Sequence, residues 1–255
     1  MATGRKERIA KAFAHTTPDH TPLFEIFQRY HPIHWDICGR NVATDNAMAW
    51  DAMSDGIAWR ELVDEQAKAQ YAINRYFDLD MVHVGGAPPE NYVRPVKTGK
   101  TTWTMDGVGY RLNDKTQLVV LETPAQSQSW SQRMSEEETR REVEEWDGST
   151  PAHTHQDNPV LERMQEFARA DGIDWVYMGE VGAGTGAAFY PPFMLMWMLT
   201  EPELYRRWLE KQKAFGFAIT EQIIRNGCGV IAMGGDVSCD KGPFISPALY
   251  DEFVL

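Results

Sequence analysis

The sequence has few cysteines and no long apolar run. Its three cysteines, Cys38, Cys228 and Cys239, are far apart and form no Cys-x-x-Cys pair, which argues against a disulfide framework. The most apolar stretch, residues 193–199, is much shorter than the about 20 residues that cross a bilayer. The N-terminus leads into a charged amphipathic segment and not into the apolar core of a signal peptide. We therefore expect a cytoplasmic protein in a reducing compartment.

Positive charge is also scarce. The chain carries 25 Lys and Arg against 37 Asp and Glu, a formal net charge of −12. Nucleic acids and anionic membranes attract basic surfaces, so this composition argues against both as partners. The chain has 255 residues, 43% of them hydrophobic, which suits one α/β barrel of about 250 residues. Without internal repeats, low-complexity segments or long Gly/Ser linkers, we expect a single domain over residues 1–255.

Short apolar segments alternate with helical patterns along the chain. The segments expected to be strands are 23–27, 81–84, 174–180 and 229–233, and the longer helical patterns cover 5–14, 59–77, 159–170 and 200–226. Residues 101–122 differ, because their alternation around Asp106-Gly107 predicts a small antiparallel insertion. Alternation of strands and helices favours a parallel sheet covered by helices. A (β/α) barrel and a doubly wound sheet both fit this pattern.

Three pairs of residues mark expected helix starts. Ser or Thr followed three positions later by Glu forms a capping box, and Ser before Pro is typical of a first turn. The pairs are Ser135 with Glu138, Thr200 with Glu203, and Ser246 with Pro247. The acidic helix that follows Ser135 is expected to turn its glutamates toward solvent.

Two carboxylates follow apolar strands directly. Glu180 ends the strand 174–180, and Asp236 comes after the strand 229–233 and two glycines. The carboxyl ends of barrel strands converge, and barrel enzymes keep their chemistry there. Glu180 and Asp236 can therefore share a pocket, where they bind a metal, act as acid and base, or hold a cationic group. Alternatively, they cap neighbouring helices or bind loop amides.

His83 lies inside the strand 81–84, just before Gly85-Gly86. It is either a ligand or proton carrier that projects into the pocket, or a hydrogen-bonded core histidine. Glycines let the backbone approach a ligand closely, so we add Gly85, Gly86, Gly182 and Gly235 as substrate-facing positions. The glycines at 182–186 depart from the dinucleotide pattern, because the third comes one residue early. A flexible active-site loop is the better interpretation of that run.

Other histidines and methionines give weaker signals. His31-x-x-His34-x-Asp36 contains ligand types, but we expect Pro32 to disrupt regular helix there, and His153-Thr-His155 lies in a polar, loop-like segment. Neither group makes a convincing metal site. The Met-rich segment 193–199 reads as a helix buried in the core or at an interface. Its thioethers can alternatively contact a large flat partner, for which Met196 is the candidate.

Two sets of residues resemble the uroporphyrinogen decarboxylase superfamily. Arg5-x-x-Arg8 with Pro18-Asp19-His20-Thr21-Pro22 resembles its opening, where an Arg-rich helix leads to a Pro-Asp-Arg-x-Pro-like turn. The run from Gly227 through Gly235-Asp236 to Gly242-Pro-Phe-Ile-Ser-Pro and Tyr250-x-x-Phe253 resembles its strand, Asp, loop and Ser-Pro helix. The resemblance follows the chain in order over nearly its whole length. It implies a (β/α)8 TIM-type barrel.

The decarboxylase branch of this superfamily fits less well. Its N-terminal loop resembles Met-Arg-Gln-Ala-Gly-Arg-Tyr, whose arginines bind substrate carboxylates. Residues 27–40 retain only Arg29 and Arg40 for that purpose, and the strand 81–84 ends in Gly85-Gly86 where the decarboxylases have an Asp. Both departures count against decarboxylation of a tetrapyrrole.

The corrinoid-dependent methyltransferase branch is the better match. It implies methyl transfer between a corrinoid, free or on a carrier protein, and a small thiol or methylated substrate. The catalytic positions are then Asp236, Glu180 and His83, and Arg29 and Met196 join the four glycines in binding substrate. Residues 28–50 and the Met-rich helix are candidates to face the corrinoid carrier, and a homo-oligomer is possible.

The resemblance also implies zinc, which activates the thiol as a thiolate. The family's ligands resemble a His-x-Cys and a later Cys beyond the Ser-Pro helix, so we expect them beyond Leu255 and expect the barrel to be C-terminally incomplete. The ligands themselves stay unknown. A tetrapyrrole decarboxylase and a non-catalytic subunit that binds a ligand or corrinoid remain the alternatives.

Overall fold

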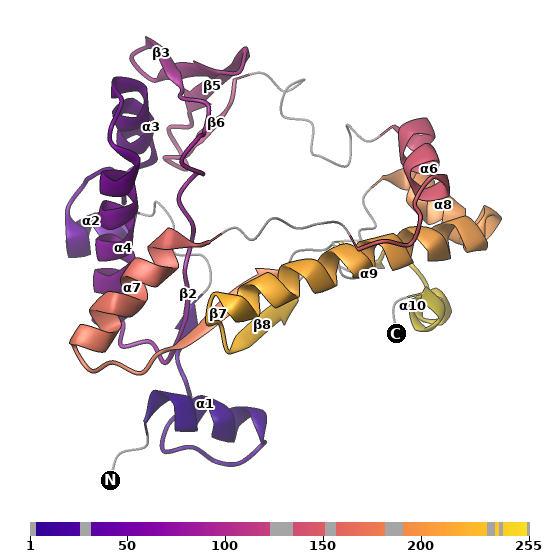
Figure 1. The fold of residues 1–255 in the computed structure, drawn as a ribbon, viewed down its shortest axis with the longest axis horizontal. Coiled ribbons are helices and arrows are strands. Elements are labelled where there is room, and N and C mark those ends of the chain that lie inside the picture. The colour runs from indigo at the N-terminus through magenta and orange to yellow at the C-terminus, as the bar shows by residue number, and fades with distance from the viewer. Residues whose placement is uncertain are drawn as a thin grey trace. The chain divides into compact units, whose positions relative to one another are not determined.

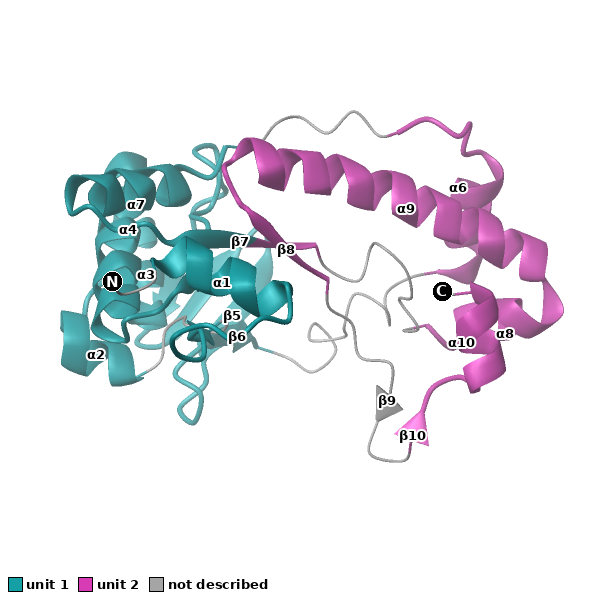
Figure 2. Ribbon diagram, turned by 90° about the horizontal axis from the view of Figure 1, so that it is seen from below, with its two compact units in different colours: residues 1–127, 157–178 teal, residues 128–156, 179–255 magenta. Residues whose placement is uncertain are grey.

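The computed structural model describes residues 4–25, 32–122, 135–150, 157–181, 191–233, 238–239 and 242–253, with only the backbone of 238–239. The chain divides into two compact units (Figure 2). Unit 1 comprises residues 1–127 and 157–178, and unit 2 comprises residues 128–156 and 179–255. Compactness does not by itself make each unit a separate domain, so the single domain expected from the sequence stays a prediction.

The helices of unit 1 are α1 (Arg5–Phe13), α2 (Pro32–Cys38), α3 (Asn46–Asp55), α4 (Trp59–Tyr76) and α7 (Pro159–Ala170) (Figure 1). The helix predicted at 59–77 is confirmed as α4, which buries Leu62, Ala69 and Ile73 along one side and packs against α7. Tyr76 was expected on the same side, but it is 69% exposed because it ends the helix. Asn158 caps α7 by accepting the Leu161 N–H at 3.1 Å.

Three parallel strands meet in unit 1: β1 (Phe24–Glu25), β2 (Met81–His83) and the start of β7 (Val176–Val181). Phe24 pairs with Met81, and His83 pairs with Met178. Sequential strands are thus neighbours. Tyr177 lies close enough to Arg169 of α7 and Tyr71 of α4 to interact with them electrostatically, so it is on the side of the sheet that these helices cover. Burial there raises the pKa of Tyr177 to about 12. Because paired residues share a face and successive residues alternate, His83 and Met178 lie on the opposite face.

The predicted antiparallel insertion is confirmed. Strands β3 (Val96–Gly99), β4 (Thr102–Met105), β5 (Val108–Leu112) and β6 (Val119–Leu121) pair in sequence order. Asp106 and Gly107 both have positive φ, 52° and 74°, as the two central residues of a type I′ hairpin turn require. Trp103 is buried under α3 and donates its indole N–H to Asp51 at 2.9 Å. The insertion is therefore anchored to α3 by the Trp103 indole, by the Lys97–Asp51 ion pair at 2.6 Å, and by the hydrogen bond from the Val119 N–H to Asn46 at 2.6 Å.

Unit 2 contains α6 (Glu136–Glu144), α8 (Pro192–Thr200), α9 (Pro202–Arg225), α10 (Pro247–Phe253), β8 (Val230–Met233), β9 (Ser238–Cys239) and β10 (Gly242–Pro243). Its helices enclose a core of Val143, Met194, Trp197, Met198, Tyr205, Trp208, Leu209 and Phe253. The glutamates at 136–138 are exposed as expected, whereas Val143 is fully buried. The acidic helix α6 is therefore amphipathic, with one apolar side in this core.

Two of the three predicted helix starts are confirmed. Ser135 accepts the Glu138 N–H, and Ser246 accepts the Leu249 N–H, both at 3.3 Å. The capping box at Thr200 is wrong. Thr200 is the last residue of α8, and its hydroxyl donates to the Met196 carbonyl at 2.9 Å. Glu201 precedes α9 in its place.

In unit 2, α9 lies very close to β7. A Cβ at Gly179 would lie 2.2 Å from the Cγ2 atom of Ile223, so the close approach requires glycine there. The helix ends at Arg225 and is followed by Gly227 with φ 86°, as expected. β8 follows β7 in the strand order of the sheet. The described residues therefore form a mixed α/β fold with a parallel and an antiparallel sheet, and closure into a barrel stays a prediction.

None of the helices in the described ranges is both long enough and apolar enough to cross a membrane.

Candidate functional site

The carboxyl edge of the parallel sheet carries His83. This residue is half-buried, on the face of β2 opposite the helices, and buried Val84 and Gly85 follow it. Glu180 is exposed and lies on the same face of β7 as Met178, since strand side chains alternate. Both residues thus lie near strand ends, as predicted. Their catalytic roles stay predictions.

Gln70 of α4 holds the backbone just after β2. Its amide donates to the Gly85 carbonyl at 3.1 Å and accepts the Gly85 N–H at 2.8 Å. One side chain thus satisfies both backbone groups of a buried residue that has left the strand ladder. Burying such groups without partners costs free energy. Gln70 therefore fixes the position at which the chain leaves the sheet, two residues after His83.

Further side chains hold the same segment. Asn158 donates to the Val84 carbonyl at 3.5 Å, and Trp59 donates to the Pro88 carbonyl at 2.8 Å. Gly86, within this segment, is exposed. It has no positive φ, and a Cβ there would meet only Asn158 at 3.9 Å, an ordinary contact. The backbone conformation therefore does not require glycine at position 86. The predicted role of Gly86 in binding substrate is compatible with this.

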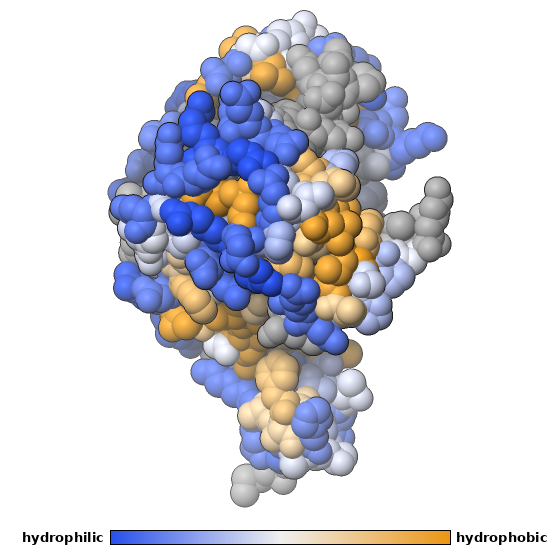
Figure 3. Space-filling view, turned by 90° about the vertical axis from the view of Figure 1, so that its right-hand side faces the viewer, coloured by the Kyte–Doolittle hydropathy of each residue, from blue (hydrophilic) through white to orange (hydrophobic). Residues whose placement is uncertain are grey.

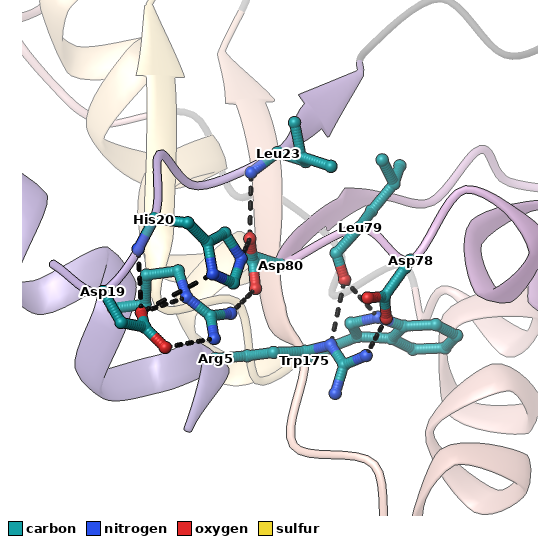
Figure 4. A network of polar contacts seen from close by, with 9 residues as sticks. Arg5, Asp19, His20, Leu23, Asp78, Leu79, Asp80 and Trp175 are labelled. Carbon is teal, nitrogen blue, oxygen red and sulfur yellow. Dashed lines mark hydrogen bonds and ion pairs between the residues drawn. The ribbon is translucent and has the colours of Figure 1, made fainter. Parts of the chain in front are cut away.

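The opposite, N-terminal edge of the sheet carries a buried ion network (Figure 4). Arg8 donates to Asp19 at 2.8 and 3.2 Å and also pairs with Asp80. Asp80 is 1% exposed and accepts the Leu23 N–H at 2.9 Å. His20 lies 3.7 Å from Asp19 and 3.9 Å from Asp80. The Asp19 hydrogen bond, followed by those of Asp80, raises the pKa of Arg8 and keeps it charged.

A second set of contacts extends this edge. Arg5 pairs with exposed Asp78 and donates to the Leu79 carbonyl at 3.1 Å, and that carbonyl also accepts the Trp175 indole N–H at 2.7 Å (Figure 4). Arg5, Arg8 and Asp19, which carry the resemblance at the start of the chain, thus fasten α1 to the segment before β2.

Arg40, one of two arginines considered for substrate carboxylates, already has a partner. It pairs with Asp45, which is 3% exposed, and its guanidinium lies 4.7 Å above the Trp35 ring. Asp45 also caps α3 by accepting the Met48 N–H at 2.9 Å. The position of Arg40 therefore follows from the local fold around α2 and α3.

The expectation that Pro32 disrupts helix is wrong. Pro32 is the first residue of α2, where its missing N–H costs nothing because that group has no intrahelical partner. His34 is buried in this helix. The other histidine of this motif, His31, lies outside the described residues, so the interpretation that the motif is no convincing metal site stays a prediction.

The cysteines with described side chains are poor ligands or nucleophiles at neutral pH. Cys38 and Cys228 are free thiols. Burial raises the pKa of both, that of Cys228 to about 11, so the reactive thiolate is scarce. In the described part of the chain, no three His, Cys, Asp or Glu residues are grouped to hold a metal ion.

The Met-rich helix α8 has one side buried in the core and one side exposed to solvent. Met194 and Met198 are buried in the core of unit 2, whereas Met196 is 54% exposed and Leu199 65% exposed. The side of the molecule with α6, α8 and α10 shows apolar surface bordered by hydrophilic surface (Figure 3). The helix is thus largely a core element, and Met196 remains accessible.

Several predicted positions lie outside the described side chains: Arg29, His153, His155, Gly182, Gly235, Asp236 and Cys239. The sequence analysis also missed three residues that shape the two sheet edges: Gln70, Asp80 and Asn158. Asp80 directly precedes a predicted strand, and Asn158 precedes Pro159 as a helix cap does. Those local signals were present. Nothing local marks Gln70, whose partner is 15 residues away.

In comparisons with known proteins, no family model, curated protein or solved structure matches the chain.

Proposed function

We propose that the protein is a methyltransferase of the uroporphyrinogen decarboxylase superfamily. It moves a methyl group between a corrinoid, free or on a carrier protein, and a small thiol or methylated substrate. The observation that carries the proposal is the arrangement of unit 1. Sequence-ordered parallel strands have α4 and α7 on one face, the family-like Arg8 and Asp19 at one edge, and His83 at the other.

The carboxyl edge supports methyl transfer over decarboxylation. The backbone after β2 is held by the neutral amides of Gln70 and Asn158, and it continues through Gly86 without a carboxylate. Arg40 is committed to Asp45 and Trp35. A substrate rich in carboxylates needs several arginines, whereas a thiol and a methylated corrinoid do not.

His83 and Glu180 have the chemistry that the reaction needs from the protein. A neutral imidazole can accept the thiol proton as a general base. A carboxylate orients a cationic or hydrogen-bonding substrate. Zinc, which the resemblance implies, would hold the thiol as a thiolate. The described residues do not form a ligand set for it.

The test is methyl transfer from methylcobalamin to coenzyme M and a panel of other thiols. The 255-residue chain and the product of the complete gene are assayed side by side, with zinc measured by elemental analysis. We expect transfer by the complete protein with about one zinc per chain, and at least a tenfold loss in kcat/KM for His83→Ala and Glu180→Gln. The matched control is Asp78→Asn, whose side chain is 79% exposed at the opposite sheet edge.

Three results would reject this proposal. Carbon dioxide released from uroporphyrinogen, without methyl transfer, would identify a decarboxylase. No transfer across the panel would leave a non-catalytic binding subunit. Activity unchanged in both variants would remove His83 and Glu180 from the mechanism.

A further inference from the structure

The antiparallel insertion formed by β3 to β6 carries opposite charges at its two ends. Asp106 and Glu122 lie at the end that the turn between β4 and β5 forms. Lys100, Arg111 and Lys115 lie at the other end, formed by the turn between β3 and β4 and the loop between β5 and β6, and all three are exposed. We call this second end, with its three cations, the basic end.

Backbone pairing brings the first two cations to the same end. Arg111 of β5 pairs with Thr102, the first residue of β4, and Lys100 lies two residues earlier in the turn between β3 and β4. The Leu112 N–H donates to the Thr101 carbonyl at 2.9 Å. This hydrogen bond ties the turn that carries Lys100 to the end of β5.

The loop that carries Lys115 is fixed by its own hydrogen bonds. The side chain of Asn113 accepts the Lys115 N–H at 2.9 Å and the Thr116 N–H at 3.2 Å. The Asn113 carbonyl accepts the Gln117 N–H at 2.8 Å. The loop follows β5 directly, so the fold itself holds the backbone of Lys115 near the other two cations.

The basic end forms no ion pairs within the described part of the chain. Lys97, the fourth cation of the insertion, pairs with Asp51 of α3 at 2.6 Å. Among the residues that the structure describes, Lys100, Arg111 and Lys115 have no such partner. Their charges are therefore available to a group from outside the chain.

The insertion is basic within an acidic chain. Residues 96–121 contain four Lys or Arg and two Asp, a formal charge of +2, whereas the whole chain has −12. Asp114 is exposed in the loop of the basic end, and three cations outweigh it. Salt screens charges beyond about 8 Å at physiological ionic strength. An approaching group therefore meets the local positive charge before the net charge of the chain.

We propose that the basic end binds an extended acidic segment of a partner protein. Its cations come from a turn, a strand end and a loop across three neighbouring strands, and strands lie about 4.8 Å apart. The cations therefore span roughly 10 Å, which three or four residues of extended chain cover at about 3.3 Å each. Carboxylates along such a segment can pair with all three cations, and each pair adds a small attraction.

Other anions fit this end less well. A nucleic acid is longer and would extend from the basic end over the acidic rest of the chain, which repels phosphates. A small inorganic anion does not span the distance between the outer cations. The contact is therefore expected to be weak, local and sensitive to salt. It does not depend on the proposed methyl transfer.

The experiment is an NMR titration of the isotope-labelled, 255-residue chain with hexaglutamate peptide. We expect saturable amide shifts at residues 99–102 and 111–117, with a dissociation constant of about 0.1–1 mM in about 20 mM salt, as a few exposed ion pairs provide. At about 0.5 M salt the affinity should fall at least tenfold, because the charges are screened.

Variants test whether the three cations carry the binding. Lys100→Gln, Arg111→Gln and Lys115→Gln should each weaken binding about two- to fivefold, and the triple variant at least about tenfold. Lys100→Arg keeps the charge and should stay within about twofold of wild type. The matched control is Lys213→Gln, which removes the charge of an exposed lysine in unit 2 and should leave binding unchanged. The amide spectrum shows whether each variant is folded.

Four results would overturn the proposal. The first is the absence of shifts with hexaglutamate at low salt, and the second is an equal loss of binding in Lys213→Gln. Tighter binding of a thymidine hexanucleotide at the same residues would assign the basic end to nucleic acid. The same shifts at the same affinity with inorganic phosphate would identify a site for a small anion.

Discussion

The two edges of the parallel sheet in unit 1 are held by different chemistry. At the N-terminal edge, Arg8 lies between Asp19 and Asp80, and the cluster is largely closed to solvent. At the carboxyl edge, the neutral amides of Gln70 and Asn158 bind backbone groups after β2. A buried charge demands partners on all sides. An amide needs only its few hydrogen bonds, so the second edge can be rigid and still present His83 and Gly86.

This comparison predicts unequal sensitivity to substitution. The charged edge should control whether unit 1 stays folded. The amide edge should control the position of the backbone near His83, at a smaller cost in stability. Each experiment below changes one edge, or one similar contact in unit 2, and asks whether the difference holds.

The largest effect is expected from Asp80→Ala. This change removes a partner of buried Arg8 and the acceptor of the Leu23 N–H. Arg8 keeps Asp19, but removing one partner of a buried ion pair costs about 3–5 kcal/mol, so the α1 and β1 amides should lose most of their protection against hydrogen exchange. The control is Asp78→Asn, an exposed partner of Arg5, which should change stability by less than about 0.5 kcal/mol. Equal losses in the two variants would mean that the network is not effectively buried.

A smaller effect is expected from Gln70→Leu. Leucine keeps much of the side-chain volume but leaves the Gly85 N–H and carbonyl without partners, at about 1–3 kcal/mol. Amide exchange at Gly85 should accelerate while exchange in α1 is unchanged. Gln70→Glu still accepts the Gly85 N–H but cannot donate to its carbonyl, so it should fall between leucine and wild type. A Gly85 amide that stays protected in Gln70→Leu would show that other contacts hold this edge.

The smallest effect is expected at a half-buried ion pair in unit 2. Arg140 donates twice to Glu201 at 2.6 Å, and these bonds hold the pKa of Glu201 below its usual value. The folded state therefore favours the carboxylate. Its contribution is complete above the unfolded pKa of about 4.3 and is lost as pH falls through the lower folded value. The melting temperature of Glu201→Gln should lie below wild type at pH 7, and the gap should narrow as the pH falls below about 4.3, the unfolded pKa. A gap that persists in acid would mean that Glu201 acts through packing.

Much of the local structure follows from nearby residues. The type I′ turn at Asp106-Gly107, the caps at Ser135 and Ser246, and the helix α4 were predictable because their causes lie within a few positions. One failure also has a local explanation. Thr200 bonds backward to Met196 and so ends one helix rather than starting the next.

The candidate site was predictable only in part. His83 and Glu180 were placed near strand ends from sequence, and the structure puts them there. The helical spacing of Ile9, Ala12 and Phe13 predicts that they form one apolar side of α1, yet Phe13 is 62% exposed and Arg8 is buried. Burial of that arginine depends on Asp80, 72 residues away, and a helical pattern carries no information about such a partner.

The sequence by itself thus determined the alternation of strands and helices, the antiparallel insertion and most helix ends, because hydrogen bonds and backbone preferences of neighbouring residues decide them. Only the tertiary structure decided that Arg8 is buried against Asp80 and that Gln70 binds Gly85. Each of these depends on which distant groups the folded chain brings near, and desolvation makes a polar or apolar group favourable or costly according to those neighbours.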